Sequence, residues 1–477
     1  MKRAGSKTVP REGRQEAGCE RFSMEQENPG SAIEATQGRD VTGGEHRELW
    51  WAEASIWTDR MVSALGNGVK ACPWAGKPDP RGGKWFSLID KVVRPATLEA
   101  AWRRVARNKG AAGVDGQSVE RFAYQSERYL LELHTELKAG TYRPSPVKRV
   151  EIPKADGKTR PLGIPAVRDR IVQAALKMVI EPIFEVQFRE GSYGFRPGRG
   201  CKDALREVDR LLKEGYTHVV DADLKGYFDT IPHDHLMALV EGSISDGRVL
   251  SLIESFLHQD IMTETARWQP EAGTPQGAVL SPLLAKLYLH PLDLLMEQSG
   301  YRMVRYADDF VILCASEAEA MAAPRQVTAW VNANGLTLHK DKTKIGDCQQ
   351  PGQGFDFLGY RFECGHRFVR AKSLTAFKDK VRARTIRSRG DSLERIVADL
   401  NPMLRGWFGY FKHARPRLFR RLDGFIRRRL RAILRKQEKR PSMGRSEADH
   451  RKWTNAFFAG MGLFTLQTAH KTARHSR

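Results

Sequence analysis

The sequence predicts an α+β body followed by an all-helical module. Between residues 86 and 362, helical stretches alternate with short β-rich runs, namely THVVDADL (217–224), FVILC (310–314) and FDFLGYRF (355–362). Such a mixture is typical of an α+β fold. After residue 370 the strand signals disappear and basic, amphipathic helical patterns replace them.

The charge of the chain indicates its class of partner. The 477 residues carry a net charge of +22, and positive charge of this size attracts polyanions. Between Ala371 and Arg440 there are 22 Lys and Arg against 6 Asp and Glu, so most of the surplus belongs to the helical module. Nucleic acid is therefore the expected partner.

Other classes of protein are not indicated. The six cysteines include no CxxC pair, which argues against a zinc ribbon or a disulfide framework. No run of 18 or more apolar residues predicts a membrane span, and the N-terminus lacks the apolar core of a signal peptide. We expect a soluble, intracellular protein with no membrane partner. Residues 1–48 are expected to be disordered because they contain few aromatic residues, and 49–85 to form a helix and loop that lead into the body.

The segment RYADDFVIL places two carboxylates side by side at Asp308 and Asp309. Its flanks are short and apolar, so it is predicted to form a hairpin with an acidic tip. Two interpretations are open from this segment alone. The tip is a solvated turn, which Asp favours, or it is a site for a divalent cation such as Mg²⁺, whose charge offsets the repulsion. A third carboxylate nearby would favour the metal site.

The run HVVDADLKGYFD supplies further carboxylates. Asp221 and Asp223 end a predicted strand and share one face, because strand side chains alternate, and Asp229 follows. Each of these taken singly could be a surface acid. Joined to the acidic hairpin, Asp223, Asp308 and Asp309 are the expected ligands of a two-metal site for phosphoryl transfer. Asp221 and Asp229 are expected to be structural or to cap a helix.

Two other segments have features of nucleotide binding. In IPKADGKTRPLGIP, Lys154 and Arg160 flank an Asp-Gly turn, and a hairpin of this kind could fold over a triphosphate. A solvated basic loop is the alternative. In TPQGAVLSP, Gln276 and Gly277 form a turn ahead of a predicted helix from Pro282. Glycine allows a base pair to approach closely, so these two residues are expected in a nucleotide pocket.

These residues resemble the motifs of reverse transcriptases encoded by group II introns. YADD, DADLKGYFD and TPQGAVLSPLLAKLYLHPLD look like the palm motifs of that family. The segments that follow in the family's order are NKGAAGVDG, YRPSPVKRVEIPKADGKTRPLGIP, GSYGFRPGRGCKDAL, GLTLHKDKTKI and FDFLGYRF, and LRGWFGYFKHA resembles the maturase module. The resemblance extends from about Trp50 to the C-terminus.

The resemblance implies an α+β right-hand polymerase, in which fingers and a palm with an antiparallel sheet are followed by an all-α thumb or maturase module. It places the fingers and palm at 86–365 and the RNA-binding helical module at 366–440. Residues 441–477 look like a short DNA-binding segment with no HNH endonuclease after it.

The resemblance also implies an activity and its partners. The chain is expected to be an RNA-directed DNA polymerase that uses two Mg²⁺ ions, with Mn²⁺ as a possible substitute. Its expected partners are group II intron RNA, a DNA primer or target, and dNTPs, and binding of the intron RNA would also assist splicing and mobility. The expected location is the bacterial cytoplasm, with association to the nucleoid on target DNA. The oligomeric state stays open.

Roles for single residues follow from the same resemblance. Lys154 and Arg160 would clamp the nucleotide, and Phe228 takes the position of the side chain that blocks a ribose 2′-hydroxyl. Lys342 resembles the lysine that protonates the leaving pyrophosphate, although Lys340 is close enough to compete. In GSYGFRPGRG the side chains expected to touch template RNA are Tyr193, Phe195, Arg196 and Arg199.

One departure and three alternatives stand beside this interpretation. Lys286 occupies a position where the family usually has Asn, which puts the local hydrogen bonding in doubt. A catalytically silent maturase that only binds and folds intron RNA is the first alternative, and the intact acidic tip disfavours it. A retron or diversity-generating reverse transcriptase is disfavoured by LRGWFGYFKHA. An RNA-dependent RNA polymerase is disfavoured by Phe228 and YADD.

Overall fold

The computed structural model describes residues 83–153, 159–339, 342–388, 390–440, 444 and 446–475. The predictions for 1–48 and for the lead-in helix lie outside these residues, and so do Lys154 and Lys340.

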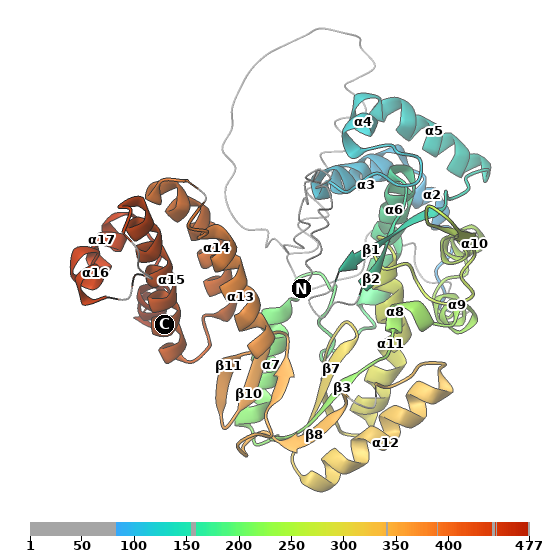
Figure 1. Ribbon diagram of the computed structural model, residues 1–477. Coiled ribbons are helices and arrows are strands. Elements are labelled where there is room, and N and C mark those ends of the chain that lie inside the picture. Colours follow the sequence, from blue (N-terminus) through green and yellow to red (C-terminus); the bar gives the residue numbers. More distant parts are fainter. Residues whose placement is uncertain are drawn as a thin grey trace, which may run out of the picture. The chain divides into compact units, whose positions relative to one another are not determined.

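A four-stranded antiparallel sheet forms the centre of the α+β body (Figure 1). Its strands are β3 (His218–Asp223), β6 (Arg302–Tyr306), β7 (Asp309–Cys314) and β8 (Lys344–Asp347), in the order β6-β7-β3-β8. The predicted strands in THVVDADL and FVILC are therefore confirmed. The predicted hairpin is also confirmed, because β6 and β7 pair directly and the acidic residues stand at their connection.

Both faces of this sheet are buried. Val220 and Ile312 belong to one hydrophobic core, whereas Val219 and Val311 belong to a second core on the other face. Successive strand residues point to opposite faces, so each strand contributes to both cores. A strand that is buried on both faces has a continuous apolar run instead of an alternating pattern, which explains the run FVILC.

Helices supply most of the first core. The central helix α6 (Val167–Glu185) is buried on most of its surface, and most of its buried residues are apolar. The other helices of the body are α2 (Ile89–Val92), α3 (Pro95–Asn108), α4 (Val119–Tyr124), α5 (Ser126–Ala139), α7 (Cys201–Lys213), α8 (Tyr227–Thr230), α9 (His233–Glu241), α10 (Gly247–Leu257), α11 (Ser281–Gln298) and α12 (Glu317–Ala333). Helices α11 and α12 contribute to the first core, and α7 contributes to the second.

A smaller sheet contains the predicted basic hairpin. Strands β1 (Val147–Pro153) and β2 (Thr159–Ile164) pair antiparallel, so the strands on both sides of the Asp-Gly turn are confirmed. The short strands β4 (Ile261–Met262) and β5 (Arg267–Trp268) extend this sheet in the order β2-β1-β4-β5.

A three-stranded sheet and a helical module complete the described chain. The sheet consists of β9 (Phe355–Phe357), β10 (Tyr360–Glu363) and β11 (His366–Val369). The helices are α13 (Ala371–Arg384), α14 (Leu393–Phe411), α15 (Pro416–Gln437), α16 (Glu447–Lys452), α17 (Asn455–Gly460) and α18 (Leu466–His475). Within the described residues no strand follows β11, which confirms the predicted all-helical module.

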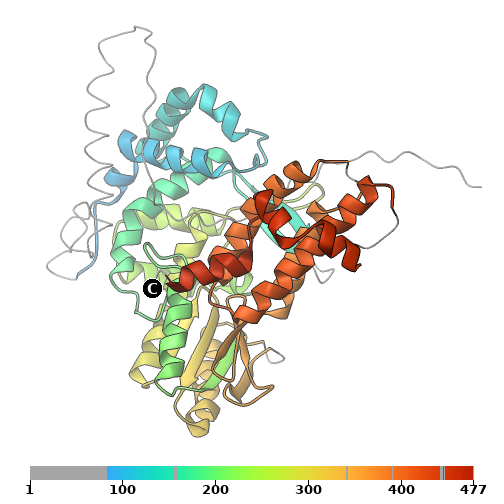
Figure 2. The same cartoon turned by 90° about the vertical axis from the view of Figure 1, so that its left-hand side faces the viewer.

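The basic helix α15 turns its apolar face inward. Leu422, Ile426 and Leu430 are buried in the second core, and α18 lies along α15 (Figure 2). The helical module therefore packs as an amphipathic bundle with many arginines outside the core. None of the helices in the described residues is both long enough and apolar enough to cross a membrane.

Candidate active site

The acidic residues of two neighbouring strands gather on one face of the central sheet. Asp223, the last residue of β3, is directly opposite Asp309, the first residue of β7. Asp221 is two positions before Asp223 and therefore points to the same face. Asp308 stands in the turn before β7, after Ala307, which has a positive φ of 61°. The fold thus brings together carboxylates that are more than 80 positions apart in the chain.

Burial and mutual repulsion both disfavour the charged form of these carboxylates. Burial raises the pKa of Asp309 to about 7, and the charge of Asp221 is the next largest cause. Burial also raises the pKa of Asp308, and Asp223 adds to that rise. Burial and the charge of Asp356 raise the pKa of Asp221 to about 6. Such mutual repulsion favours the approach of a cation.

A lysine from a distant segment reaches this acidic face. The Nζ atom of Lys342 lies 2.6 Å from Oδ2 of Asp223. The backbone N–H of His339 donates to the carbonyl oxygen of Asp223 at 2.8 Å, which anchors the segment before β8 to the end of β3. The structure therefore places Lys342 beside the carboxylates, and its role as a proton donor stays a prediction.

The residues predicted to bind the nucleotide also lie close together. Lys154 is the exception, because it lies outside the described residues. Arg160 on β2 donates from Nε to Oε1 of Gln276 at 2.7 Å. Gly277 has a φ of 110°, and a Cβ atom there would lie 2.5 Å from the carbonyl oxygen of Gly163. Only glycine fits this close approach of two backbones, so the TPQG turn and the basic hairpin form one unit.

Phe228 is connected to the same turn. It belongs to α8, is half-buried, and contacts the ring of Tyr227 with 5.5 Å between ring centroids. The N–H of Thr274 donates to the carbonyl oxygen of Phe228 at 2.6 Å, and Gln276 Nε2 is 3.4 Å from Oδ2 of Asp229. The segment that follows the acidic strand β3 is therefore hydrogen-bonded to the TPQG turn, with Phe228 and Asp229 beside Thr274 and Gln276.

Sequence comparison identifies proteins that share these segments. Residues 152–362 match the family described as reverse transcriptase (RNA-dependent DNA polymerase), and residues 374–453 match the group II intron, maturase-specific domain. Protein YkfC of Escherichia coli (strain K12) is 36% identical over 330 residues, which cover 60% of this chain and 84% of YkfC. The group II intron-encoded protein LtrA of Lactococcus lactis subsp. cremoris is 38% identical over 209 residues, which cover 43% of this chain and 34% of LtrA.

The chain belongs to the group II intron reverse transcriptase and maturase family. This membership confirms the predicted fold class, a right-hand polymerase followed by a helical module. The chain spans most of YkfC but only about a third of the length of LtrA. Among solved structures, a chain of the partial Cas6-RT-Cas1–Cas2 complex is 26% identical over 52% of this chain and 41% of that chain, at a TM-score of 0.33. The membership rests on the sequence matches alone.

Polymerases of the reverse transcriptase family use divalent metal ions, and the acidic face has the residue types that such ions require. Carboxylate oxygens are the ligands that hard cations prefer, and burial together with repulsion from neighbouring carboxylates raises the pKa of Asp308 and Asp309. Among the described residues, no three His, Cys, Asp or Glu side chains already converge as a closed metal site. The residue types therefore fit such an ion, but the side chains do not form its coordination shell as they stand.

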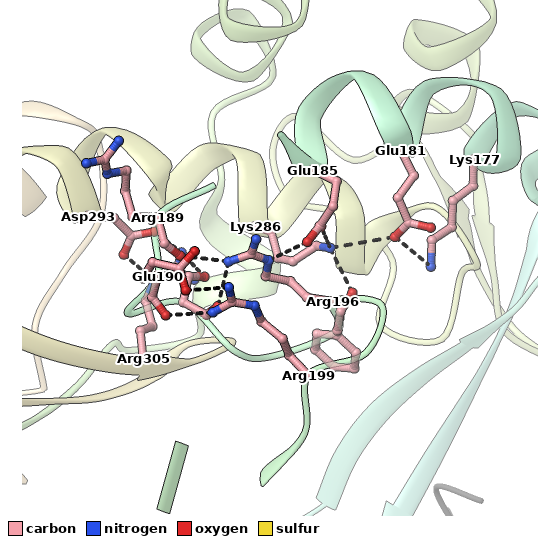
Figure 3. A network of polar contacts seen from close by, with 12 residues as sticks. Lys177, Glu181, Glu185, Arg189, Glu190, Arg196, Arg199, Lys286, Asp293 and Arg305 are labelled. Carbon is pink, nitrogen blue, oxygen red and sulfur yellow. Dashed lines mark hydrogen bonds and ion pairs between the residues drawn. The ribbon is translucent and has the colours of Figure 1, made fainter. Parts of the chain in front are cut away.

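Sequence reasoning missed a buried arginine beneath the acidic turn (Figure 3). Arg305, the residue two positions before Ala307, is 0% exposed. Its Nε atom donates to Oδ1 of Asp293 at 2.7 Å, and its Nη1 atom donates to the carbonyl oxygen of Ala307 at 2.8 Å. The third guanidinium nitrogen, Nη2, donates to the hydroxyl of Ser192 at 2.9 Å. The one available signal was a charged residue inside a predicted buried strand.

Two cations of the GSYGFRPGRG loop have partners within the protein (Figure 3). Arg196 is buried, with Nε 2.6 Å from Oε1 of Glu185. Arg199 is half-buried and pairs with Glu190 at 2.5 Å. The expectation that Arg196 touches template RNA is therefore wrong, because its guanidinium is enclosed and already paired. A run of alternating aromatic and basic residues does not reveal which of its cations are internal.

Proposed function

We propose that this chain is an RNA-directed DNA polymerase that extends a DNA primer with dNTPs on a group II intron RNA template. The intact acidic face carries the proposal, since Asp223, Asp308 and Asp309 come together on adjoining strand ends. A relative that had kept only RNA binding would not need this buried and mutually repelling set of carboxylates. Membership of the reverse transcriptase family supports the same conclusion.

The three carboxylates are proposed to hold two Mg²⁺ ions, or Mn²⁺ in their place. When bound, such ions supply positive charge to the reacting phosphate and to the attacking and leaving oxygens. The chain's own contribution is to fix the ligands on a rigid sheet, with Asp223 and Asp309 in register. The elevated pKa of Asp309 is consistent with a site that gains stability when it accepts a cation.

The neighbouring residues are proposed to receive the incoming nucleotide. Arg160, together with Lys154, would bind the triphosphate, and the bond from Arg160 to Gln276 would orient the guanidinium. Phe228 would exclude a ribose 2′-hydroxyl, and Gly277 would leave room for the new base pair. Lys342 would give a proton to the leaving pyrophosphate, for which its ammonium must leave Asp223.

Binding of intron RNA, with assistance to splicing and mobility, is the second part of the proposed function. A basic cleft of about 420 Å³ supports it. The cleft lies among β11, the α14–α15 connection and α18, and its basic side chains include Arg367, Lys412, Arg415 and Arg474. Its one acid, Asp209, is already paired with Arg367 and Lys213. Phosphate groups fit such a surface.

Extension of a DNA primer on an RNA template tests the polymerase, with Asp308→Ala as the variant. We expect the unmodified protein to make DNA with dNTPs and Mg²⁺, and the variant to lose at least about 100-fold in rate. Asp234→Asn is the matched control, because this carboxylate is 81% exposed on α9. No synthesis by the unmodified protein, with tight RNA binding retained, would favour the silent maturase instead.

A salt titration tests the RNA-binding module separately. Each phosphate contact that is lost lowers the slope of log affinity against log salt by roughly 1. Lys412→Ala combined with Arg474→Ala should therefore weaken binding of intron RNA and reduce the slope, while primer extension on an unrelated template changes little. An unchanged slope would exclude the cleft as an RNA contact.

A further inference from the structure

An aromatic residue is exposed beside the acidic turn in an unusual backbone conformation. Phe195 has a φ of +56° and is 40% exposed. Its ring centroid is 6.4 Å from that of Tyr306, the last residue of β6, which pairs with Asp309. A bulky residue at positive φ is rare and costs free energy, and such strain is kept where the surrounding structure imposes it, often at functional sites.

A buried lysine holds this conformation from inside the protein (Figure 3). The Nζ atom of Lys286, on α11, donates to the carbonyl oxygen of Phe195 at 2.7 Å, and the Lys286 side chain is 1% exposed. Glu181 and Glu185 of α6 lie 3.6 and 3.8 Å from the same atom. Burial lowers the pKa of Lys286 to about 8, which shows that enclosing this cation has a cost. The ammonium of Lys286 is thus held between two carboxylates of α6 and the backbone carbonyl of Phe195.

The residues before Phe195 in the GSYGFRPGRG loop, Tyr193 and Gly194, contact the acidic turn and the strand before it. A Cβ atom on Gly194 would lie 2.2 Å from the backbone nitrogen of Ala307, so the two backbones are in direct contact. The N–H of Tyr193 donates to the carbonyl oxygen of Arg305 at 2.8 Å, and Arg305 in turn donates to the carbonyl oxygen of Ala307 at 2.8 Å. Phe195 and Asp308 therefore share one anchor, and their relative position is set by the same contacts.

We propose that Phe195 is a stacking surface for a nucleobase of the bound primer–template, and that Lys286 is the residue that positions it. This inference rests on the proposed function, which brings a nucleic acid to the acidic turn. Stacking suits a polymerase because every base has an aromatic face, so the contact tolerates any sequence. The carbonyl oxygen of Phe195 accepts from Lys286 and the guanidinium of Arg196 is paired with Glu185, whereas the ring of Phe195 is exposed and can meet a ligand.

Fluorescence of 2-aminopurine tests the stacking directly, because stacking quenches this base. The probe would be placed at each of the positions around the primer terminus, on either strand, and titrated with protein in the absence of dNTPs. We expect quenching at a restricted set of positions, its loss in Phe195→Ala, and its retention in Phe195→Trp. Affinity of Phe195→Ala for the primer–template should fall roughly tenfold, within the range that base stacking gives.

Two further variants separate stacking from general damage. Phe86→Ala removes another exposed phenylalanine, 51% exposed and outside this loop, and should change neither quenching nor affinity. Lys286→Met removes the donor to Phe195 and should weaken the quenching at the same positions, whereas Lys286→Gln, which keeps an N–H donor, should recover part of it. A merely structural role for Lys286 would lower the amount of folded protein but leave unchanged the quenching per folded protein bound to the primer–template.

The outcomes distinguish this inference from the proposed function. Unchanged quenching and affinity in Phe195→Ala, in a protein that extends primers, would overturn the stacking role alone. Position-specific quenching that depends on Phe195, in a protein that does not extend primers, would support the stacking role and contradict the polymerase. Absence of primer–template binding by the unmodified protein would overturn both.

Discussion

Lys342 and Asp223 form an ion pair across the acidic face, with 2.6 Å between Nζ and Oδ2, although they are 119 positions apart in the chain. Both side chains are partly exposed, so the pair itself contributes little to stability, about 0–1 kcal/mol. Its position matters more, because the ammonium stands beside a carboxylate proposed to hold a metal ion. Lys342 and the ion therefore compete for Asp223.

Replacing Lys342 by Met should separate these two effects. The Mg²⁺ concentration for half-maximal primer extension should fall by up to about fivefold, since the competing charge is gone. At saturating Mg²⁺ the turnover rate should fall by about 100-fold, because the proton donor is lost. Lys342→Arg is the control, since it restores the positive charge but not an acid of suitable pKa. An unchanged Mg²⁺ dependence in Lys342→Met would show that the pair does not compete with the metal.

The raised pKa of Asp309 predicts how stability depends on pH when metal ions are removed by EDTA. The pKa is about 7 in the folded protein and about 3.9 in the unfolded chain, so the folded state binds more protons between these values. The free energy of unfolding should therefore fall as the pH rises from about 4 to 7 and level off above that.

Asp309→Asn should weaken this pH dependence, and the remainder should come from Asp221 and Asp308, whose pKa values are also raised. At pH 8 in EDTA the variant should be more stable than the unmodified protein by on the order of 2 kcal/mol, because a buried and repelled charge is absent. Saturating Mg²⁺ should reverse the order, since only the carboxylate gains a cation. Thermal unfolding at several pH values would measure both effects, and identical pH profiles for the two proteins would contradict the prediction.

The Arg305–Asp293 pair should be important for stability as well as for the acidic turn. Arg305→Gln leaves Asp293 buried without its partner, which costs roughly 3–5 kcal/mol. Adding Asp293→Asn should recover part of this loss. Urea unfolding would measure both, with Arg189→Gln as the control, because Arg189 pairs with Glu297 of α11 at the surface and should cost less than about 1 kcal/mol. Equal losses in the two single variants would contradict the assignment.

Gly194→Ala should impair activity more than stability. The added methyl would lie 2.2 Å from the backbone nitrogen of Ala307, so the loop and the acidic turn must move apart. We expect primer extension to fall at least tenfold, with a smaller proportionate loss of stability, because the displacement falls on the turn that carries Asp308. Gly200→Ala is the control in the same loop, since its nearest atom would be 3.9 Å away. Full activity in Gly194→Ala would show that the turn tolerates displacement.

Local patterns were enough to predict the parts of the site that depend on neighbours in the chain. The apolar flanks of Asp308 and Asp309 predicted a hairpin, and the alternation at Asp221 and Asp223 predicted their common face, because strand geometry fixes both. The loss of strand signals after residue 370 predicted the helical module. These features follow from backbone periodicity, which a short window of sequence contains.

Contacts between distant segments could not be predicted in this way. The burial of Arg305, and the use of Arg196 inside the protein instead of on a nucleic acid, depend on Asp293 and Glu185, which other helices bring close. A lone charged residue in a sequence carries no sign of whether its partner is a ligand or a buried acid. Only the packing of the elements decides which of the two it meets.

The sequence by itself therefore determined the fold class and the family and selected the three carboxylates proposed as metal ligands, since these depend on periodicity and on motifs of adjacent residues. The tertiary structure alone decided that Lys286 is buried against the carbonyl of Phe195, and that this loop is fixed to the acidic turn. The physical reason is that the free energy of a charged side chain depends on its surroundings. A cation is costly in an apolar interior and is kept there only where backbone and carboxylate oxygens from distant segments converge on it.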